Sequence, residues 1–120
     1  MEKGEVVFSC RRPLVAAHYP AMFSHVVFFW TDPAKASAVD ELLAGIDKYL
    51  KPIPGVVSLH RGRMVRSHRA VVDQSYQVGL NILFPNKQAQ DAYQVHPQHL
   101  AFVEAVCQPL CTKVVVYDFE

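Results

Sequence analysis

The segment His25-Val-Val-Phe-Phe-Trp30 decides the fold class of this 120-residue chain. Its β-branched and aromatic residues favour a strand, which the turn residues Thr31-Asp32-Pro33 end. Alternate side chains of a strand point to opposite faces, and here both faces are mainly apolar. One face carries His25, Val27 and Phe29, and the other carries Val26, Phe28 and Trp30. We therefore expect a strand that is covered on both sides.

The rest of the chain alternates between helical and strand periods. Apolar residues at helical spacing predict a helix from about residue 34 to residue 50, which Pro52-Ile-Pro54-Gly55 ends. The elements expected after it are a strand over 56–65 with Gly62 as a candidate bulge, a strand over 76–84 in which Tyr76, Val78, Leu80 and Ile82 share a face, a helix from Pro85-Asn86 to about Tyr93, a second helical piece to Pro109, and a strand over 113–119. This β-α-β-β-α-β order assigns the chain to the α+β class, with a ferredoxin-like protomer.

The predicted sheet has more apolar surface than its own helices can cover. Two helices cover only one face of a four-stranded sheet, whereas the strands carry apolar residues on both faces. An uncovered apolar face of that size marks an interface or a pocket. We therefore expect a homodimer in which the sheet faces of two protomers pack against each other.

Composition indicates one globular domain, with 51% hydrophobic and 19% charged residues. The formal net charge of +1 gives no electrostatic reason to expect a nucleic acid or an anionic membrane as partner. No apolar run approaches the length that spans a membrane. Four arginines at close spacing are expected on a solvated strand face and loop: Arg61, Arg63, Arg66 and Arg69.

The three cysteines, Cys10, Cys107 and Cys111, form neither a disulfide framework nor a zinc signature. We interpret them as reduced thiols in a cytoplasmic protein. Residues 1–21 differ in character from the rest and are predicted to be an N-terminal extension, with a short extra strand over 5–10 and Met22 as an alternative start. The domain itself is predicted over residues 22–120.

The segment Tyr93-Gln-Val-His96-Pro97-Gln-His99 joins two expected helices. Proline fixes φ and lacks an amide proton, so it suits the first position of a helix and disrupts the interior. Pro97 is therefore expected to end one helix and start the next, with His96 at the N-cap. This break brings Tyr93 and His99 together.

Two interpretations of this segment remain open. In the first, His99 lies at the positive end of a helix dipole, which lowers its pKa and makes it a general base, and Tyr93 orients it or stabilises an enolate. A pocket for an apolar ligand would be lined by Val27, Phe29, Leu43, Ile46, Val78 and Leu80. In the second, the histidines are structural: His96 caps a helix, while His99 and His25 bond to their surroundings.

We predict neither a metal nor a cofactor. His96 and His99, at i and i+3, supply two ligands at most, and no acidic residue or cysteine follows at ligand spacing. Zinc requires three or four protein ligands.

Four segments in order resemble the stress-responsive dimeric α/β barrel (Dabb) domain over residues 22–120. They are the first strand from His25, the Ile-Pro-Gly-Val turn at 53–56, the Tyr-x-x-His-Pro-x-His-x-x-Phe segment at 93–102, and Val-Val-Val-Tyr-Asp-Phe at 114–119. The resemblance implies a ferredoxin-like protomer and a homodimer that closes an α/β barrel.

The same resemblance implies roles for single residues. The family includes a plant polyketide cyclase that needs no cofactor, and its working tyrosine and histidine correspond to Tyr93 and His99. The histidine of the first strand corresponds to His25, which by this resemblance also lines the ligand pocket, whereas a further pocket histidine falls on Val78. Two hypotheses follow: a stress-responsive binding module of unassigned activity for a small apolar ligand, or a cofactor-independent cyclase-like lyase or isomerase with His99 as base and Tyr93 as its partner.

Overall fold

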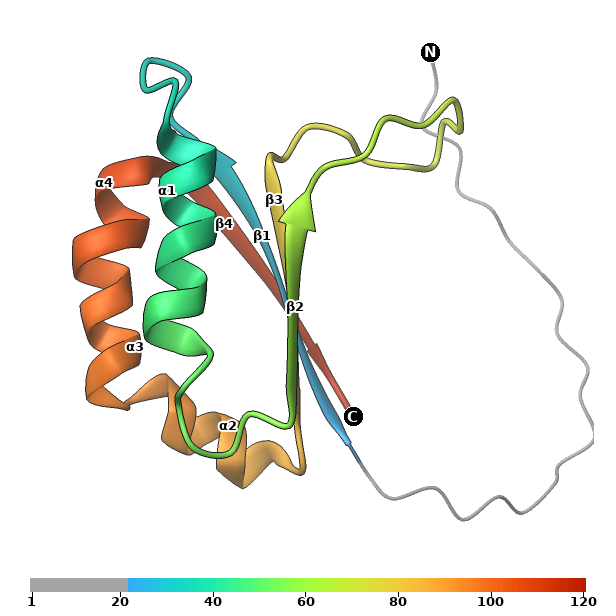
Figure 1. Ribbon diagram of the computed structural model, residues 1–120. Coiled ribbons are helices and arrows are strands. Elements are labelled where there is room, and N and C mark those ends of the chain that lie inside the picture. Colours follow the sequence, from blue (N-terminus) through green and yellow to red (C-terminus); the bar gives the residue numbers. More distant parts are fainter. Residues whose placement is uncertain (1–21) are drawn as a thin grey trace, which may run out of the picture.

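The computed structural model describes residues 22–120 as a four-stranded antiparallel sheet with helices on one face (Figure 1). The strands are β1 (Phe23–Thr31), β2 (Ser58–Arg63), β3 (Val78–Phe84) and β4 (Cys111–Phe119), in the order β2-β3-β1-β4. The helical segments are α1 (Ala38–Gly45), η1 (Ile46–Leu50), α2 (Lys87–Gln94), α3 (Pro97–Phe102), η2 (Val103–Cys107) and α4 (Gln108–Leu110). The predicted α+β class and ferredoxin-like order are confirmed. The extension predicted at 1–21, with its strand over 5–10, lies outside the described residues.

Strand β1 lies between β3 and β4 and sets the register of the sheet. Val27 stands opposite Leu80 on β3 and Val116 on β4. Along β1, alternate residues from Phe23 to Thr31 are buried and those between them are half-buried. The face with Val27 and Phe29 is therefore covered as predicted, whereas the face with Val26, Phe28 and Trp30 is only partly covered within one protomer.

Helix α1 continues into the π-helical turn η1, and together they form the first helical arm. Asp40 and Glu41 lie in the first turn of α1, where carboxylates favour the positive end of the helix dipole. The predicted start near residue 34 was too early, because the Asp32 side chain accepts from the Ala34 amide at 2.9 Å and holds a turn there. Gly55 adopts φ 93° in the turn that follows, a conformation that favours glycine.

Two ion pairs connect the edge strand β2 to this helical arm. Arg61 donates to both carboxylate oxygens of Asp47, at 3.1 and 2.6 Å, and Arg63 pairs with Asp40. Bidentate contacts of this kind fix orientation as well as distance. The register of β2 with β3 runs without a shift through Gly62, so the bulge predicted at this glycine was wrong.

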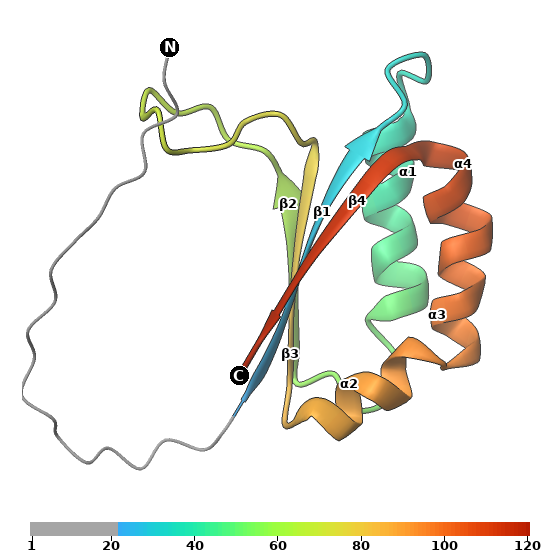
Figure 2. The same cartoon turned by 180° about the vertical axis from the view of Figure 1, so that it is seen from behind.

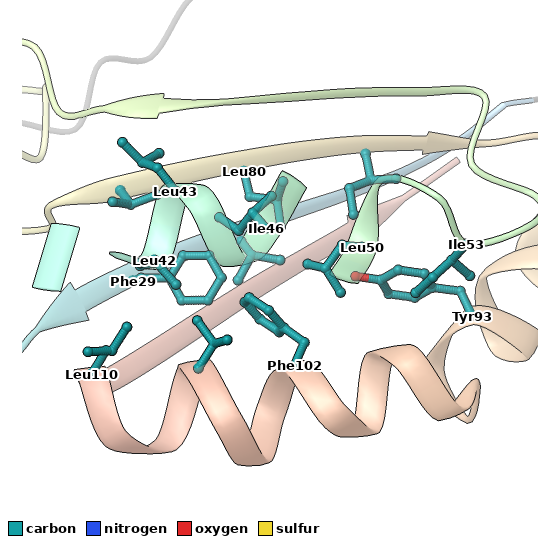
Figure 3. Close-up of a cluster of buried hydrophobic side chains, with 14 of the residues drawn as sticks. Phe29, Leu42, Leu43, Ile46, Leu50, Ile53, Leu80, Tyr93, Phe102 and Leu110 are labelled. Carbon is teal, nitrogen blue, oxygen red and sulfur yellow. The ribbon is translucent and has the colours of Figure 1, made fainter. Parts of the chain in front are cut away.

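The core lies between the helical arms and the inner face of the sheet (Figure 3). Leu42, Ile46 and Leu50 contribute one helical stripe, and Phe102 and Val106 contribute another. The arms approach closely at Gly45, where an added Cβ would lie 2.6 Å from a methyl group of Val106. A larger residue at Gly45 would therefore force the two arms apart.

Within residues 22–120 no helix covers the opposite face of the sheet, and Figure 2 shows all the helices on one side of the strands. Tyr117 and Phe119 of β4 are each 61% exposed there. Tyr76 packs on this face as well, with its ring centroid 4.8 Å from that of Phe28. The prediction that Tyr76 shares a face with Val78 was wrong, because β3 begins only at Val78 and the preceding connection turns the tyrosine to the other side.

Over residues 22–120, no helix is long and apolar enough to cross a membrane.

Candidate functional site

The break around Pro97 is formed as the sequence predicts. Asn86 caps α2, with its side chain accepting from the Ala89 amide at 2.9 Å. His96 caps α3, since its Nδ1 accepts from the Gln98 amide at 3.1 Å, and Pro97 occupies the first turn. The His96 ring is thus engaged as a cap.

A cavity of about 320 Å³ lies between the sheet and the arm formed by α3 and η2. Strand residues form one wall and helix residues the other. Its lining is His25, Val27, Phe29, Leu50, Leu80, Tyr93, Gln94, His99, Phe102, Val103, Cys107, Val114, Val116 and Asp118. The cavity opens beside β4, where Val114 and Val116 remain 41% and 45% exposed although they face the helical side.

Six of the residues predicted for the site come together in this lining: His25, Val27, Phe29, Leu80, Tyr93 and His99. The other three do not line the cavity. Leu43, Ile46 and Val78 are buried in the core instead, with exposures of 8%, 0% and 0%. Helix α1 packs against the β2 side of the sheet and leaves no cavity there. The cavity lies instead beneath the second helical arm, which is formed by α3 and η2.

Tyr93 and His99 converge across the break, with their ring centroids 4.8 Å apart. The Tyr93 ring also lies 5.7 Å from the ring of His25. Tyr93 is 1% exposed, and this burial raises the pKa of its phenol above the ordinary range. The hydroxyl, which lies beside Leu50 in Figure 3, is therefore a neutral hydrogen-bond donor at neutral pH.

Burial lowers the pKa of His99, and the neighbouring His25 lowers it further, whereas the backbone carbonyl of Gln94 acts in the opposite direction. The direction is the one expected from the sequence, but desolvation is the main cause rather than the helix dipole. The Nδ1 atom of His99 is buried and has no hydrogen-bond partner among the described residues. Burial thus favours the neutral imidazole of His99, which has one unsatisfied nitrogen among the described residues.

His25 is held by Asp118, which lies in the segment 114–119 but was not predicted to be a site residue. The Nδ1 atom of His25 lies 2.6 Å from an Asp118 carboxylate oxygen. The two residues stand opposite each other on β1 and β4. Only the register of the strands reveals this pair, because the residues are 93 positions apart. A carboxylate partner fixes the tautomer and the orientation of an imidazole.

The cavity combines a largely apolar wall with a group of polar side chains: His25 with Asp118, Tyr93 and His99. Such a site can hold an apolar molecule and bind a polar atom at one end. Within residues 22–120, no three side chains of histidine, cysteine, aspartate or glutamate gather in a group that could hold a metal ion.

Comparison with known proteins identifies relatives of the whole described domain. The family model for the stress-responsive A/B barrel domain matches residues 23–120. A stress-response A/B barrel domain-containing protein of Arabidopsis thaliana is 31% identical over 81 residues, which cover 68% of this chain and 71% of the relative.

Solved structures share the fold. A Dabb family protein of Mesorhizobium loti with a ferredoxin-like fold is 27% identical, with a TM-score of 0.69 over 82% of this chain and 95% of the other. A dimeric ferredoxin-like protein of Jannaschia is 25% identical, with a TM-score of 0.63 over 83% and 99%. A hydroxynitrile lyase of Passiflora edulis is 17% identical, with a TM-score of 0.71 over 84% and 94%.

The lowered pKa of His99 can be measured directly. We expect its imidazole signals to titrate in NMR with a midpoint below 6.5, the ordinary value. Tyr93→Phe keeps the ring that buries His99 and should leave the midpoint low, whereas Tyr93→Ala admits water and should raise it toward 6.5. The unfolded chain binds a proton at His99 more readily than the folded chain does. The free energy of unfolding should therefore decrease as the pH falls through 6.5 toward the lower pKa of the folded protein. A midpoint at or above 6.5 in the wild-type protein contradicts this description.

Proposed function

The chain belongs to the stress-responsive A/B barrel domain family, and we propose that it is a homodimeric protein that binds a small, largely apolar molecule in the cavity beside His25, Tyr93 and His99. The observation that carries this proposal is the cavity itself, which is lined mainly by apolar side chains and has its polar groups clustered. These groups favour a ligand with one carbonyl or hydroxyl oxygen. Tyr93 can donate a hydrogen bond to that oxygen, and the remaining wall suits an alkyl or aryl body.

The entrance supports the same assignment. Val114 and Val116 make the rim beside β4 apolar, and Asp118 is the one acidic residue in the lining. An anionic ligand would meet this carboxylate and find no lysine or arginine in the wall. We therefore propose uncharged ketones, aldehydes or phenols as the class of ligand.

Binding can be tested by an NMR titration with acetophenone, using ethylbenzene as its carbonyl-free counterpart. We expect acetophenone to bind more tightly and to shift the amide signals of His99 and Val116, because the counterpart leaves the polar groups of the cavity unpaired. Val116→Trp should fill the entrance and weaken binding at least about tenfold, the effect of losing about 1.4 kcal/mol. Val57→Trp, at an exposed residue outside the cavity lining, is the matched control. Equal binding of the two compounds, or no binding of either, contradicts the proposal.

A second function, cofactor-independent proton transfer, is favoured by the unsatisfied Nδ1 of His99. A neutral imidazole can remove a proton from the carbon next to a carbonyl group, and the buried Tyr93 hydroxyl can donate to the enolate oxygen that forms. Asp118 holds the His25 ring in place at the same site. The hydroxynitrile lyase of Passiflora edulis shows that this fold can carry a lyase.

This second function predicts exchange of the methyl protons of acetophenone in D₂O, followed by NMR. The wild-type protein should accelerate exchange, and His99→Gln should reduce the acceleration by about 100-fold or more. The rate should rise with pH through the folded pKa of His99, since only the neutral imidazole accepts a proton. His68→Gln changes an exposed histidine outside the cavity and should exchange like the wild type. Exchange at the buffer rate in the wild-type protein excludes this function for ketones while leaving binding intact.

The proposed homodimer rests on the sheet face that the helices leave uncovered. Phe28, Trp30 and Tyr76 form an aromatic cluster there, and Tyr117 packs beside it, with its ring centroid 6.3 Å from that of Phe28. Aromatic residues of this kind are enriched at the centres of interfaces. The solved relative from Jannaschia is dimeric, which supports the same assembly here.

Light scattering tests the dimer. The wild-type chain should have twice the 13.5 kDa mass of one protomer at micromolar concentration. Tyr117→Lys should shift it toward the monomer, because a lysine on the apolar face would be buried without a partner. Val95→Lys replaces an exposed valine of the helical side and should leave the dimer intact. A monomeric wild-type protein refutes the assembly.

A further inference from the structure

Two cysteines meet where the second helical arm joins the sheet. Cys107 ends η2 and Cys111 begins β4, with only the short helix α4 between them. Cys107 and Cys111 are the N-cap and C-cap residues of α4, so one helical turn separates them. Each thiol shifts the pKa of the other, which agrees with side chains that lie close together. Both are free and half-buried, so reagents can reach them.

The two cysteines belong to different walls of the site. Cys107 lines the cavity on the same arm as His99 and Phe102. Cys111 pairs with Thr31 at the start of the β1–β4 ladder, and the Leu110 carbonyl beside it accepts from the Asp32 amide at 2.8 Å. Cys111 is therefore fixed to the sheet, whereas Cys107 belongs to a helical wall.

We propose that Cys107 and Cys111 are a redox-active dithiol, whose closure to an intrachain disulfide restricts the cavity. The inference that these two cysteines form a disulfide depends only on their positions. The inference that the disulfide weakens ligand binding rests on the proposed function. Reversible disulfides of this kind in reducing compartments act in redox sensing.

The reaction needs an oxidant, and the disulfide of a small thiol such as oxidised glutathione supplies it. The Cys107 thiolate attacks one sulfur of that disulfide, forms a mixed disulfide and releases one glutathione thiolate. The Cys111 thiolate then attacks the Cys107 sulfur and releases the second glutathione. Two electrons pass from the cysteines to glutathione, and the two protons of the cysteines end on the two glutathione thiols.

The roles of the two thiols follow from their opposite pKa shifts. Cys111 as a donor lowers the pKa of the Cys107 thiol, and the same contact raises the pKa of Cys111. The thiolate is the nucleophile in disulfide exchange, so Cys107 is the attacking residue and Cys111 the resolving one.

The effect on the cavity follows from the placement of the bond. A disulfide requires an S–S separation of about 2.05 Å, shorter than any contact between two thiols. It would draw the end of η2 toward the start of β4, and the cavity opens between these elements. The π-helical turn of η2 has five residues and ends at Cys107 itself, so this strain acts directly on the helical wall. Loosely wound turns of this type often lie at functional sites.

The test uses the full chain with Cys10→Ser, so that only the two cysteines of this pair can react. Treatment with oxidised glutathione should lower the intact mass by two hydrogen atoms and protect both thiols from alkylation, without cross-linking two chains. The disulfide should weaken acetophenone binding by about fivefold or more, and a reducing agent should restore it. In the same background, Cys111→Ser should form no intrachain disulfide. After treatment with oxidised glutathione and then with a reducing agent, this variant should bind acetophenone as tightly as the reduced Cys10→Ser protein does.

The outcomes separate this proposal from the proposed function. If the reduced protein does not bind acetophenone, the proposed binding function is refuted. The dithiol is then tested by the change in intact mass on oxidation and by the amide shifts of His99 and Val116. Gly55, in the turn after η1, serves as the remote reference for those shifts. The proposal is overturned if both thiols remain alkylatable after oxidation, or if the disulfide forms and changes neither the affinity nor the shifts of the two cavity residues.

Discussion

Burial of both faces of β1 is the constraint on which the rest of this structure depends. The strand lies inside the sheet, so its side chains alternate between two environments that must both exclude water. The helical arms satisfy the face that carries Val27 and Phe29. The other face, with Phe28 and Trp30, has no cover within residues 22–120, and this leads from the fold to the proposed assembly.

The break at Pro97 sets the geometry of the candidate site in the same way that β1 sets the fold. A continuous helix would carry the His99 ring past Tyr93, whereas the capped break turns the chain so that the rings meet. Burial raises the pKa of the phenol and lowers the pKa of the imidazole, which favours the neutral form of both groups. The aromatic packing that encloses Tyr93 thus stabilises the core and also perturbs both groups.

Local patterns predicted what local physics decides, and the errors lie where distant segments meet. Alternation gave the faces of β1, and proline chemistry gave the break with His96 as cap. Asp118 was missed because its role depends on the pairing of β1 with β4. The prediction that Leu43, Ile46 and Val78 line the pocket was wrong because a periodic pattern identifies only the side of a strand or helix that faces inward. It does not show where the helices pack tightly on the sheet and where they leave a cavity. Tyr76 changed sides because the strand begins two residues later than its apolar pattern.

The position of β4 at the edge of the sheet has a consequence for how such a domain can diverge. Val114 and Val116 form the rim of the cavity but contribute little to the core, since each remains nearly half exposed. Under the proposed binding function, exchanges at these two positions change which molecules enter while leaving the folding free energy almost unchanged. The proposed selectivity of the cavity and the stability of the scaffold then depend on separate residues, so ligand preference can change without a matching loss of stability.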